Sequence, residues 1–252
     1  MKSFFITVLL AANSSFAIQS SLIAMSGQGK VQLIELYSSE SCSSCPPADQ
    51  WVTELKNEPE LWKSFVPVVF HVDYWNNLGW KDDYSSEPMT KRQIDISKHW
   101  AEPSVYTPGF IVDGKEWKNW RQTKKHQLPA AETSQKITLS VFRDAADNYI
   151  VKATGLQYLQ KYIIRLAWLG MDLKTKVTSG ENSGKMLEHN FVVLNWDFRI
   201  IDSKKAEALF QIKKSEVKST PKAIAAWIEL DANPTPLQAT GGYLLNPATV
   251  KK

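Results

Sequence analysis

The chain has two cysteines, Cys42 and Cys45, and two serines separate them in a C-x-x-C motif. A disulfide across two residues closes a loop too short to remove much conformational entropy from the unfolded chain, so stability is a weak reason for this spacing. Neighbouring thiols at this spacing instead exchange electrons with other thiols and disulfides. The motif therefore predicts a redox-active disulfide, and the alternatives are a tight structural bridge or two idle thiols.

The motif lies between two predicted elements that set its chemistry. Residues 30–37 are rich in Val, Ile, Leu and Tyr, which indicates a buried strand, and residues 48–56 carry apolar side chains on one helical face. The N-terminus of a helix presents N–H groups and a partial positive charge, and both favour a thiolate. We therefore expect Cys42 to attack a partner and Cys45 to resolve the mixed disulfide.

Two prolines, Pro46 and Pro47, constrain where this helix begins. Proline lacks an N–H group and fits only the first turn of a helix, because further along its ring meets a backbone carbonyl. A helix that begins at Ser44 or Cys45 avoids this clash and leaves Cys42 just ahead of the positive end.

A second strand, a second helix and a hairpin follow the motif. The strand is predicted at residues 65–72, the helix at residues 91–101, and the hairpin at Asp113-Gly114, a pair that favours a two-residue turn. Strand, helix, strand, helix and hairpin in this order indicate an α/β domain with a partly parallel sheet. We place this domain at residues 28–125.

The pair Thr107-Pro108 stands just before the hairpin, where a loop leads into a short apolar strand. A thioredoxin fold carries a cis-proline at this place, and in combination with the C-x-x-C motif we predict a cis peptide bond here. Thr107 and Pro108 would then present their backbone to an extended substrate opposite the disulfide. An ordinary trans-proline at the start of a strand is the alternative.

Residues 136–252 show a different pattern, with short extended runs separated by turn or polar residues. Several runs alternate apolar and polar side chains, which is typical of strands with one buried face. Runs of this number and spacing indicate an antiparallel β-sandwich. The predicted fold class is therefore an α/β thioredoxin-like N-terminal domain followed by an antiparallel β-sandwich C-terminal domain with an accessory role. The runs are residues 137–141, 149–154, 162–169, 191–196, 198–201, 208–212 and 223–230.

Three aromatic side chains, Tyr74, Trp75 and Trp80, gather with several acidic residues in the segment 72–83. This segment follows the second predicted strand, whose C-terminal end lies at the edge where α/β sheets bind ligands. We expect the aromatic side chains either to wall a groove for a substrate or to pack the loop on the sheet.

One histidine, His71, ends the same strand. With Cys42 and Cys45 it would complete a two-sulfur, one-nitrogen site for copper or zinc. A core histidine bonded to backbone is the commoner case, so the sequence assigns no metal and keeps a copper-handling module as an alternative function.

The polar segment from Gly180 to Lys185 (GENSGK) has glycines that are common in phosphate-binding loops. It lacks the spacing and the strand-to-helix setting of such a loop. We expect it to form a loop at the end of the sandwich.

The N-terminal segment has the layout of a secretory signal peptide. Lys2 gives a positive start, residues 4–12 form a short apolar run, and Ser15 and Ala17 place small residues at a cleavage site. We predict a signal peptide at residues 1–17 and a periplasmic or secreted protein, with no stable membrane insertion after cleavage, because a bilayer span needs about 20 apolar residues. The net charge of +4 is spread along the chain and forms no stripe for nucleic acid.

On these residues the chain resembles the DUF1223 family of exported, thioredoxin-like bacterial proteins. The resemblance spans nearly the whole mature chain and is most specific around the cysteines. It implies a thioredoxin-like fold and names no substrate. One local departure is Gly109, where a bulkier residue commonly follows the Thr-Pro pair. The matching segments are residues 35–39, 42–49, 70–75, 78–82, 105–108, 112–114, 180–185 and 189–190.

Together these features favour an exported thiol–disulfide oxidoreductase, or a redox-dependent protein of that type. The expected partner is a thiol- or disulfide-containing protein or a small thiol, and no nucleic acid. No cofactor is expected, because the disulfide itself carries the two electrons. The alternatives are the copper-handling module and a non-catalytic binding protein that keeps its disulfide permanently oxidised and uses the aromatic segment.

Overall fold

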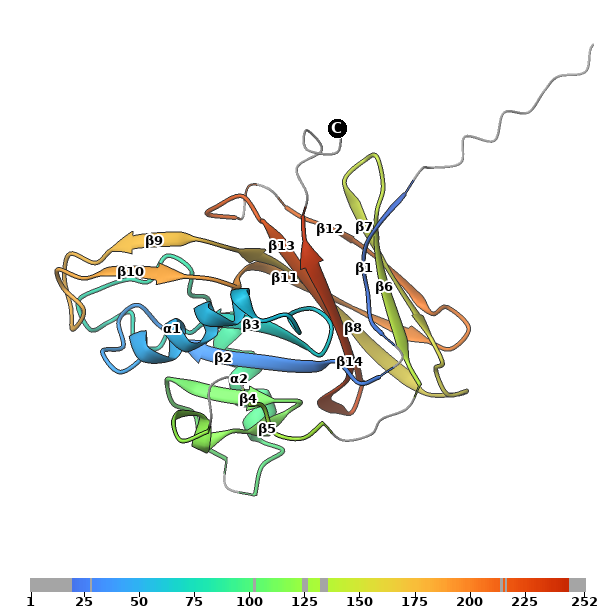
Figure 1. Cartoon of the computed structure of the whole chain (residues 1–252), viewed down its shortest axis with the longest axis horizontal. Helices are drawn as coiled ribbons and strands as arrows, with labels where there is room; N and C mark the ends of the chain where they lie inside the picture. The colour runs from blue at the N-terminus through green and yellow to red at the C-terminus, as the bar shows by residue number, and fades with distance from the viewer. Residues whose placement is uncertain are drawn as a thin grey trace, which may run out of the picture.

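The structure of the chain, a computed structural model, describes residues 20–27, 29–101, 103–123, 127–131, 136–213, 215 and 217–244. The predicted signal peptide lies outside these residues. Strands dominate the described part of the chain (Figure 1), and neither of its α-helices has the length and apolar run needed to cross a bilayer. The helices are α1 (Pro46–Glu54) and α2 (Glu87–Ser97), with 3₁₀ turns at Leu55–Asn57 and Lys118–Arg121. The strands are β1 (Ser21–Met25), β2 (Gln32–Ser38), β3 (Phe65–His71), β4 (Gly109–Val112), β5 (Lys115–Glu116), β6 (Thr138–Arg143), β7 (Asn148–Thr154), β8 (Lys161–Gly170), β9 (Leu173–Lys176), β10 (Met186–His189), β11 (Val192–Asp202), β12 (Glu207–Gln211), β13 (Ala223–Leu230) and β14 (Asn233–Tyr243).

Three sheets contain these strands. The largest has eight strands in the order β14-β13-β8-β11-β3-β2-β4-β5, a second has four in the order β1-β6-β7-β12, and β9 and β10 form a separate hairpin. Strand β3 pairs in parallel with both of its neighbours, β2 and β11, whereas the other pairs of the large sheet are antiparallel.

The predicted fold class, a thioredoxin-like α/β domain followed by an antiparallel β-sandwich domain, was wrong. The structure is mostly strand, and one mixed sheet runs through both halves of the sequence. The two halves of the sequence join where Val192 of β11 pairs with Val69 of β3. There the N–H of Val69 donates to the carbonyl of Phe191 at 2.9 Å. Strand patterns are local in sequence, whereas long-range packing decides which strand covers the free edge of β3. The predicted domain boundaries, residues 28–125 and 136–252, stay a prediction. They concern whether each segment folds on its own, which sheet topology does not test.

Several local predictions were confirmed. The strands expected at residues 30–37 and 65–72 are β2 and β3. The pair Asp113-Gly114 connects β4 and β5, and both residues have positive φ angles, 48° and 78°. A two-residue hairpin turn of this kind requires positive φ at both positions, which is why this pair is favoured there.

The two faces of the eight-stranded sheet bury against different cores. In β8, Leu166 and Trp168 belong to a core shared with the four-stranded sheet, whereas Ala167 and Leu169 belong to a core shared with the helices. Successive side chains of a strand point to opposite faces, so a central strand of this sheet is buried on both. This explains why β13 (AIAAWIEL) is apolar at nearly every position. Figure 1 shows the four-stranded sheet on one side of the large sheet and α1 well away from it.

A buried group of charges ties helix α2 to the large sheet. The guanidinium of Arg92 donates to both carboxylate oxygens of Glu35 on β2, at 2.7 and 3.0 Å, and lies 3.6 Å from Glu229 on β13. It also lies over the ring of Trp227, 5.0 Å from its centroid. A buried charge is tolerated only when it is paired, so these residues depend on one another.

We predict that Arg92→Met destabilises the protein by about 3–5 kcal/mol, because it leaves the buried carboxylate of Glu35 without its main partner and removes one of the two arginines beside Glu229, the other being Arg165. The measurement is urea unfolding followed by tryptophan fluorescence. The matched control is Lys91→Met, which makes the same kind of change one residue earlier at an exposed position paired with Asp95. Equal stability of the two variants would contradict this account.

Candidate functional site

The cysteine turn, residues 39–45, connects β2 to α1. Cys42 and Cys45 form a disulfide, with an S–S length of 2.33 Å and Cα atoms 5.5 Å apart. Cys45 is the N-cap of α1, and Pro46 and Pro47 occupy the first two helical positions. The predicted helix start at Ser44 or Cys45 is thus confirmed, since prolines are tolerated there and nowhere later in the helix.

The first turn of α1 has few N–H groups for a thiolate. Pro46 and Pro47 have none, and the N–H groups of Ala48 and Asp49 both donate to the carbonyl of Cys45, at 2.8 and 3.1 Å. The expected hydrogen bonds from the helix N-terminus to the sulfur of Cys42 are therefore not available from these residues. What remains is the field of the helix dipole, which acts without a direct contact.

The disulfide is almost fully covered. Cys42 is 2% exposed and Cys45 is 0% exposed, whereas the two serines between them face solvent. The hydroxyl of Ser44 lies 3.3 Å from the sulfur of Cys42. A disulfide sulfur carries no proton, so this hydroxyl donates. In a thiolate state the same O–H group would stabilise the negative sulfur.

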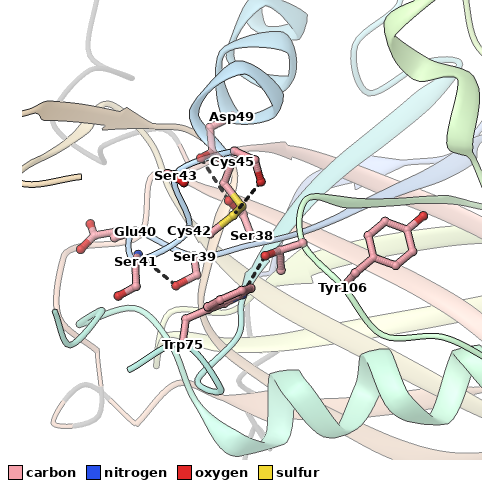
Figure 2. Close-up of a disulfide and its surroundings, with 12 residues drawn as sticks. Ser38, Ser39, Glu40, Ser41, Cys42, Ser43, Cys45, Asp49, Trp75 and Tyr106 are labelled. Atoms are coloured by element: carbon pink, nitrogen blue, oxygen red, sulfur yellow. Dashed lines mark hydrogen bonds between the residues drawn. A yellow bond between two sulfur atoms is a disulfide. The ribbon is translucent and has the colours of Figure 1, made fainter. Parts of the chain in front are cut away.

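Two of the three predicted groove residues tie the aromatic loop, residues 72–83, to its surroundings: Trp80 contacts the cysteine turn, and Trp75 contacts Thr107. The indole N–H of Trp80 donates to Glu40 at 2.8 Å, and the carbonyl of Trp80 accepts from Ser41 at 2.7 Å. The indole N–H of Trp75 donates to the hydroxyl of Thr107 at 2.8 Å. Figure 2 shows Trp75 and Asp49 on opposite sides of the disulfide.

The third groove candidate, Tyr74, lies further out. Its hydroxyl donates to Gln93 of α2 at 3.3 Å, and its ring centroid is 5.8 Å from that of Trp75. Burial raises the pKa of Tyr74 to about 12, despite the opposing hydrogen bonds, so this phenol stays protonated at neutral pH.

The peptide bond between Thr107 and Pro108 is cis, as the sequence predicts. These two residues line a pocket of about 300 Å³ together with Ser44 of the cysteine turn. The rest of its wall comes from Tyr106, from Phe110 of β4 and from four residues that follow β5, namely Trp117, Lys118, Trp120 and Arg121. None of the three predicted groove residues lines this pocket; of its lining residues, the sequence singled out Thr107 and Pro108 but none of the aromatic ones.

A hairpin turn far away in sequence holds the cysteine turn in place. The side-chain amide of Asn182, between β9 and β10, donates to the carbonyls of Glu40 and Cys42 at 2.8 and 3.0 Å. Glu181 accepts from the N–H of Ser43 at 3.2 Å. The GENSGK segment is therefore part of the site and was wrongly assigned to the end of a sandwich. Its only sequence signal was that the family resemblance includes it together with the cysteine block.

Buried acidic and histidine side chains fill the space beneath the cysteine turn. Nδ1 of His71 lies 2.6 Å from Asp82, which also accepts from the N–H of Glu40 at 2.9 Å. Nε2 of His189 lies 3.2 Å from the carboxylate of Glu40, and the two imidazole centroids are 5.0 Å apart. Asp49 accepts from the hydroxyl of Ser38 at 3.1 Å. The sequence singled out His71 and the acidic segment that contains Asp82 but did not bring the cluster together, because its members come from five separate segments.

The pKa values of these groups follow from burial and pairing. Burial alone lowers the pKa of His71, but the attraction of Asp82, the hydrogen bond between them and the nearby Asp49 and Glu40 raise it to about 9. Asp82, in spite of its burial, has a lowered pKa because of His71. Burial raises the pKa of Asp49, and the two histidines oppose this only in part. The cluster thus holds an ion pair beside a carboxyl group that resists ionisation.

The predicted alternative of a metal site at Cys42, Cys45 and His71 gains no support from the geometry. The cysteines are bonded to each other, and Nδ1 of His71 is paired with Asp82. Within the described residues, no group of three or more His, Cys, Asp or Glu side chains is arranged to hold a metal ion.

We predict that stability falls as pH rises through about 9. His71 has a folded pKa above its ordinary value of 6.5, so its contribution is complete below about pH 6.5 and is lost as the folded form deprotonates. The loss amounts to about 3 kcal/mol. Urea unfolding between pH 6 and pH 10 measures it, and Asp82→Asn should flatten the dependence. A variant as pH-dependent as the parent protein would refute the ion pair.

We also predict that Asn182→Ala destabilises the protein by about 2–3 kcal/mol, because the carbonyl of Glu40 loses this donor and the carbonyl of Cys42 keeps only the N–H of Cys45. The same change should speed reduction of the disulfide by dithiothreitol, since the turn is no longer held. Ser183→Ala, an exposed neighbour on the same turn, is the control. Unchanged stability and reduction rate in Asn182→Ala would show that the hairpin does not position the cysteines.

Comparison with known proteins identifies the family and the fold. The crystal structure of protein AGR_C_4864 from Agrobacterium tumefaciens is similar, with 22% identity, a TM-score of 0.60, and coverage of 88% of this chain and 97% of that one. HBP35 of Porphyromonas gingivalis is similar with 13% identity, a TM-score of 0.56, and coverage of 90% and 80%. At these identities the likeness shows the fold alone. No curated protein matches the chain. A family model described as "Protein of unknown function (DUF1223)" matches residues 33–229, and the chain therefore belongs to the DUF1223 family.

Proposed function

We propose that the protein is a thiol–disulfide oxidoreductase that exchanges electrons with a partner through Cys42 and Cys45. The observation that carries the proposal is the disulfide itself, which joins the chain's two cysteines at the start of a helix and next to a pocket. The pocket gives a partner a place to bind beside the serines of the motif. The family resemblance adds no substrate.

The reaction is a pair of exchange steps. A partner thiolate attacks the sulfur of Cys42, a new S–S bond forms, and Cys45 leaves as a thiolate. A second partner thiolate then attacks the partner's own sulfur in this mixed disulfide, and Cys42 leaves. The partner has become a disulfide and the protein a dithiol, so two electrons have moved to the protein; the reverse sequence reduces a partner disulfide.

Two groups around the disulfide fit this chemistry. The Ser44 hydroxyl at 3.3 Å favours a thiolate at Cys42, and the field of α1 acts in the same direction. Asp49 of α1, with its raised pKa, lies next to the pair (Figure 2), and its N–H donates to the carbonyl of Cys45 at 3.1 Å. A raised pKa makes the carboxylate of Asp49 a better proton acceptor than an ordinary one, and a resolving thiol must give up its proton before it attacks.

We further propose that the reaction takes place after export, in the periplasm or outside the cell. The supporting features are the signal-peptide pattern of residues 1–17 and a disulfide, which persists in oxidising compartments.

The burial of the disulfide favours a second candidate function. At 2% and 0% exposure, the pair is as buried as a permanent structural disulfide, in which case the protein binds its partner without exchanging electrons. The copper-handling alternative has no comparable observation in its favour.

Trapping separates these two functions. In Cys45→Ser, the thiol of Cys42 can form a mixed disulfide that no neighbouring thiol resolves, so we expect a stable adduct with a disulfide-containing peptide. Mass spectrometry of the intact protein detects it. Cys42→Ser is the matched control and should give at least about tenfold less adduct, because Cys45 is fully buried. No adduct with either variant would favour the permanent disulfide.

A further inference from the structure

The pocket beside the cysteine turn has rigid aromatic walls. Trp117 and Trp120 are only 7% and 8% exposed and contact Phe110 of β4, with ring centroids 5.7 and 4.9 Å apart. Trp51 of α1 packs edge-on against Trp117 at 5.4 Å. Side chains held on several sides in this way keep their positions without a ligand, so the pocket is pre-formed.

The charges at the pocket are unequal. Lys118 pairs with Glu116 at 3.1 Å, and Glu116 also accepts from the hydroxyl of Tyr106 at 2.6 Å, so the charge of Lys118 is compensated. Arg121 lies over the ring of Trp120, 4.7 Å from its centroid, and has no carboxylate partner among the residues that the structure describes. Within the described part of the chain, the pocket therefore presents one guanidinium without a carboxylate partner, and it lies over an aromatic face.

The opposite flank of the cysteine turn has the opposite charge. Glu181 accepts from the N–H of Ser43 and stays exposed. Hydrogen bonds from the side chain and the backbone N–H of Ser43 lower the pKa of Glu181, so the carboxylate is ionised at neutral pH. A partner that lies across Ser43 and Ser44 thus meets a negative charge on one side and a positive charge on the other.

The size of the pocket limits what it can take. A volume of about 300 Å³ is at the lower end of ligand pockets and has room for one side chain or a small molecule rather than a large cofactor. A carboxylate can bind a guanidinium through two parallel hydrogen bonds, and its methylene stem can lie on the tryptophan walls.

From this juxtaposition we infer that the pocket is a specificity site for an acidic residue of the substrate, one position away from the substrate's reactive cysteine. The inference rests on the proposed function and names its substrate class, a peptide segment in which a cysteine has a Glu or Asp on one side only. The Arg121 guanidinium binds the carboxylate, and Glu181 repels an acidic residue on the other side.

The test measures binding without chemistry. Four synthetic peptides carry serine in place of the cysteine, with Glu or Gln either directly before or directly after it. Their dissociation constants are measured at low salt from the fluorescence of the pocket tryptophans. We expect Glu to bind about 3- to 10-fold more tightly than Gln in one of the two placements, and no more tightly in the other. High salt should remove the preference.

Variants assign the preference to the pocket. Arg121→Gln should abolish it, so that the Glu and Gln peptides bind this variant with equal dissociation constants. Arg199→Gln, the same change at an exposed arginine of β11 outside the pocket, should preserve it. The inference is overturned if Glu and Gln bind equally in both placements, if Arg121→Gln keeps the preference, or if no peptide binds with a dissociation constant below about 1 mM.

The rate of thiol–disulfide exchange is measured separately, so that failure of the pocket's selectivity can be told apart from failure of the proposed function. The same peptides with cysteine restored, presented as mixed disulfides to the reduced protein, report electron exchange. Charge-selective binding without exchange would support the pocket and contradict the oxidoreductase. Exchange at equal rates with Glu and Gln peptides would support the oxidoreductase and contradict the pocket's selectivity.

Discussion

The parallel pairing of β11 with β3 is the constraint on which the arrangement of the site depends. Val192 pairs with Val69, and the β9–β10 hairpin directly precedes β11 in the chain. The pairing therefore carries the hairpin over the end of β3, where Asn182 reaches a carbonyl of the cysteine turn 140 residues away in sequence. His189, at the end of the hairpin, likewise reaches His71 at the end of β3. Sheet register, and no local preference of the chain, brings these groups together.

The disulfide separates two different environments. Beneath it, His71 and Asp82 are buried and paired with each other, and burial raises the pKa of Asp49. Above it, Ser43 and Ser44 face solvent beside an aromatic pocket. Burial of ionised groups is costly unless each has a partner, which explains why carboxylates and imidazoles alternate in the lower layer. Charged groups in such a buried layer can shift the pKa of a cysteine thiol although a bound partner does not contact them.

Much of the local structure could be predicted from the sequence, because it depends on neighbouring residues. The helix start at Cys45 follows from Pro46 and Pro47, and the hairpin turn follows from Asp113 and Gly114. The overall fold could not be predicted in this way. A buried strand pattern such as that of β13 indicates two covered faces but not which layers cover them. For the same reason the contact of Asn182 with the cysteine turn left no signal in spacing or composition.

The reduction potential of the Cys42–Cys45 disulfide tests the central claim most directly. Equilibration of the protein in glutathione or dithiothreitol buffers, followed by alkylation of the free thiols, measures it. A disulfide that exchanges electrons with partners should have a potential between about −270 and −120 mV, the range of known exchange proteins. A potential below about −300 mV would place the pair among permanent structural disulfides and contradict the account.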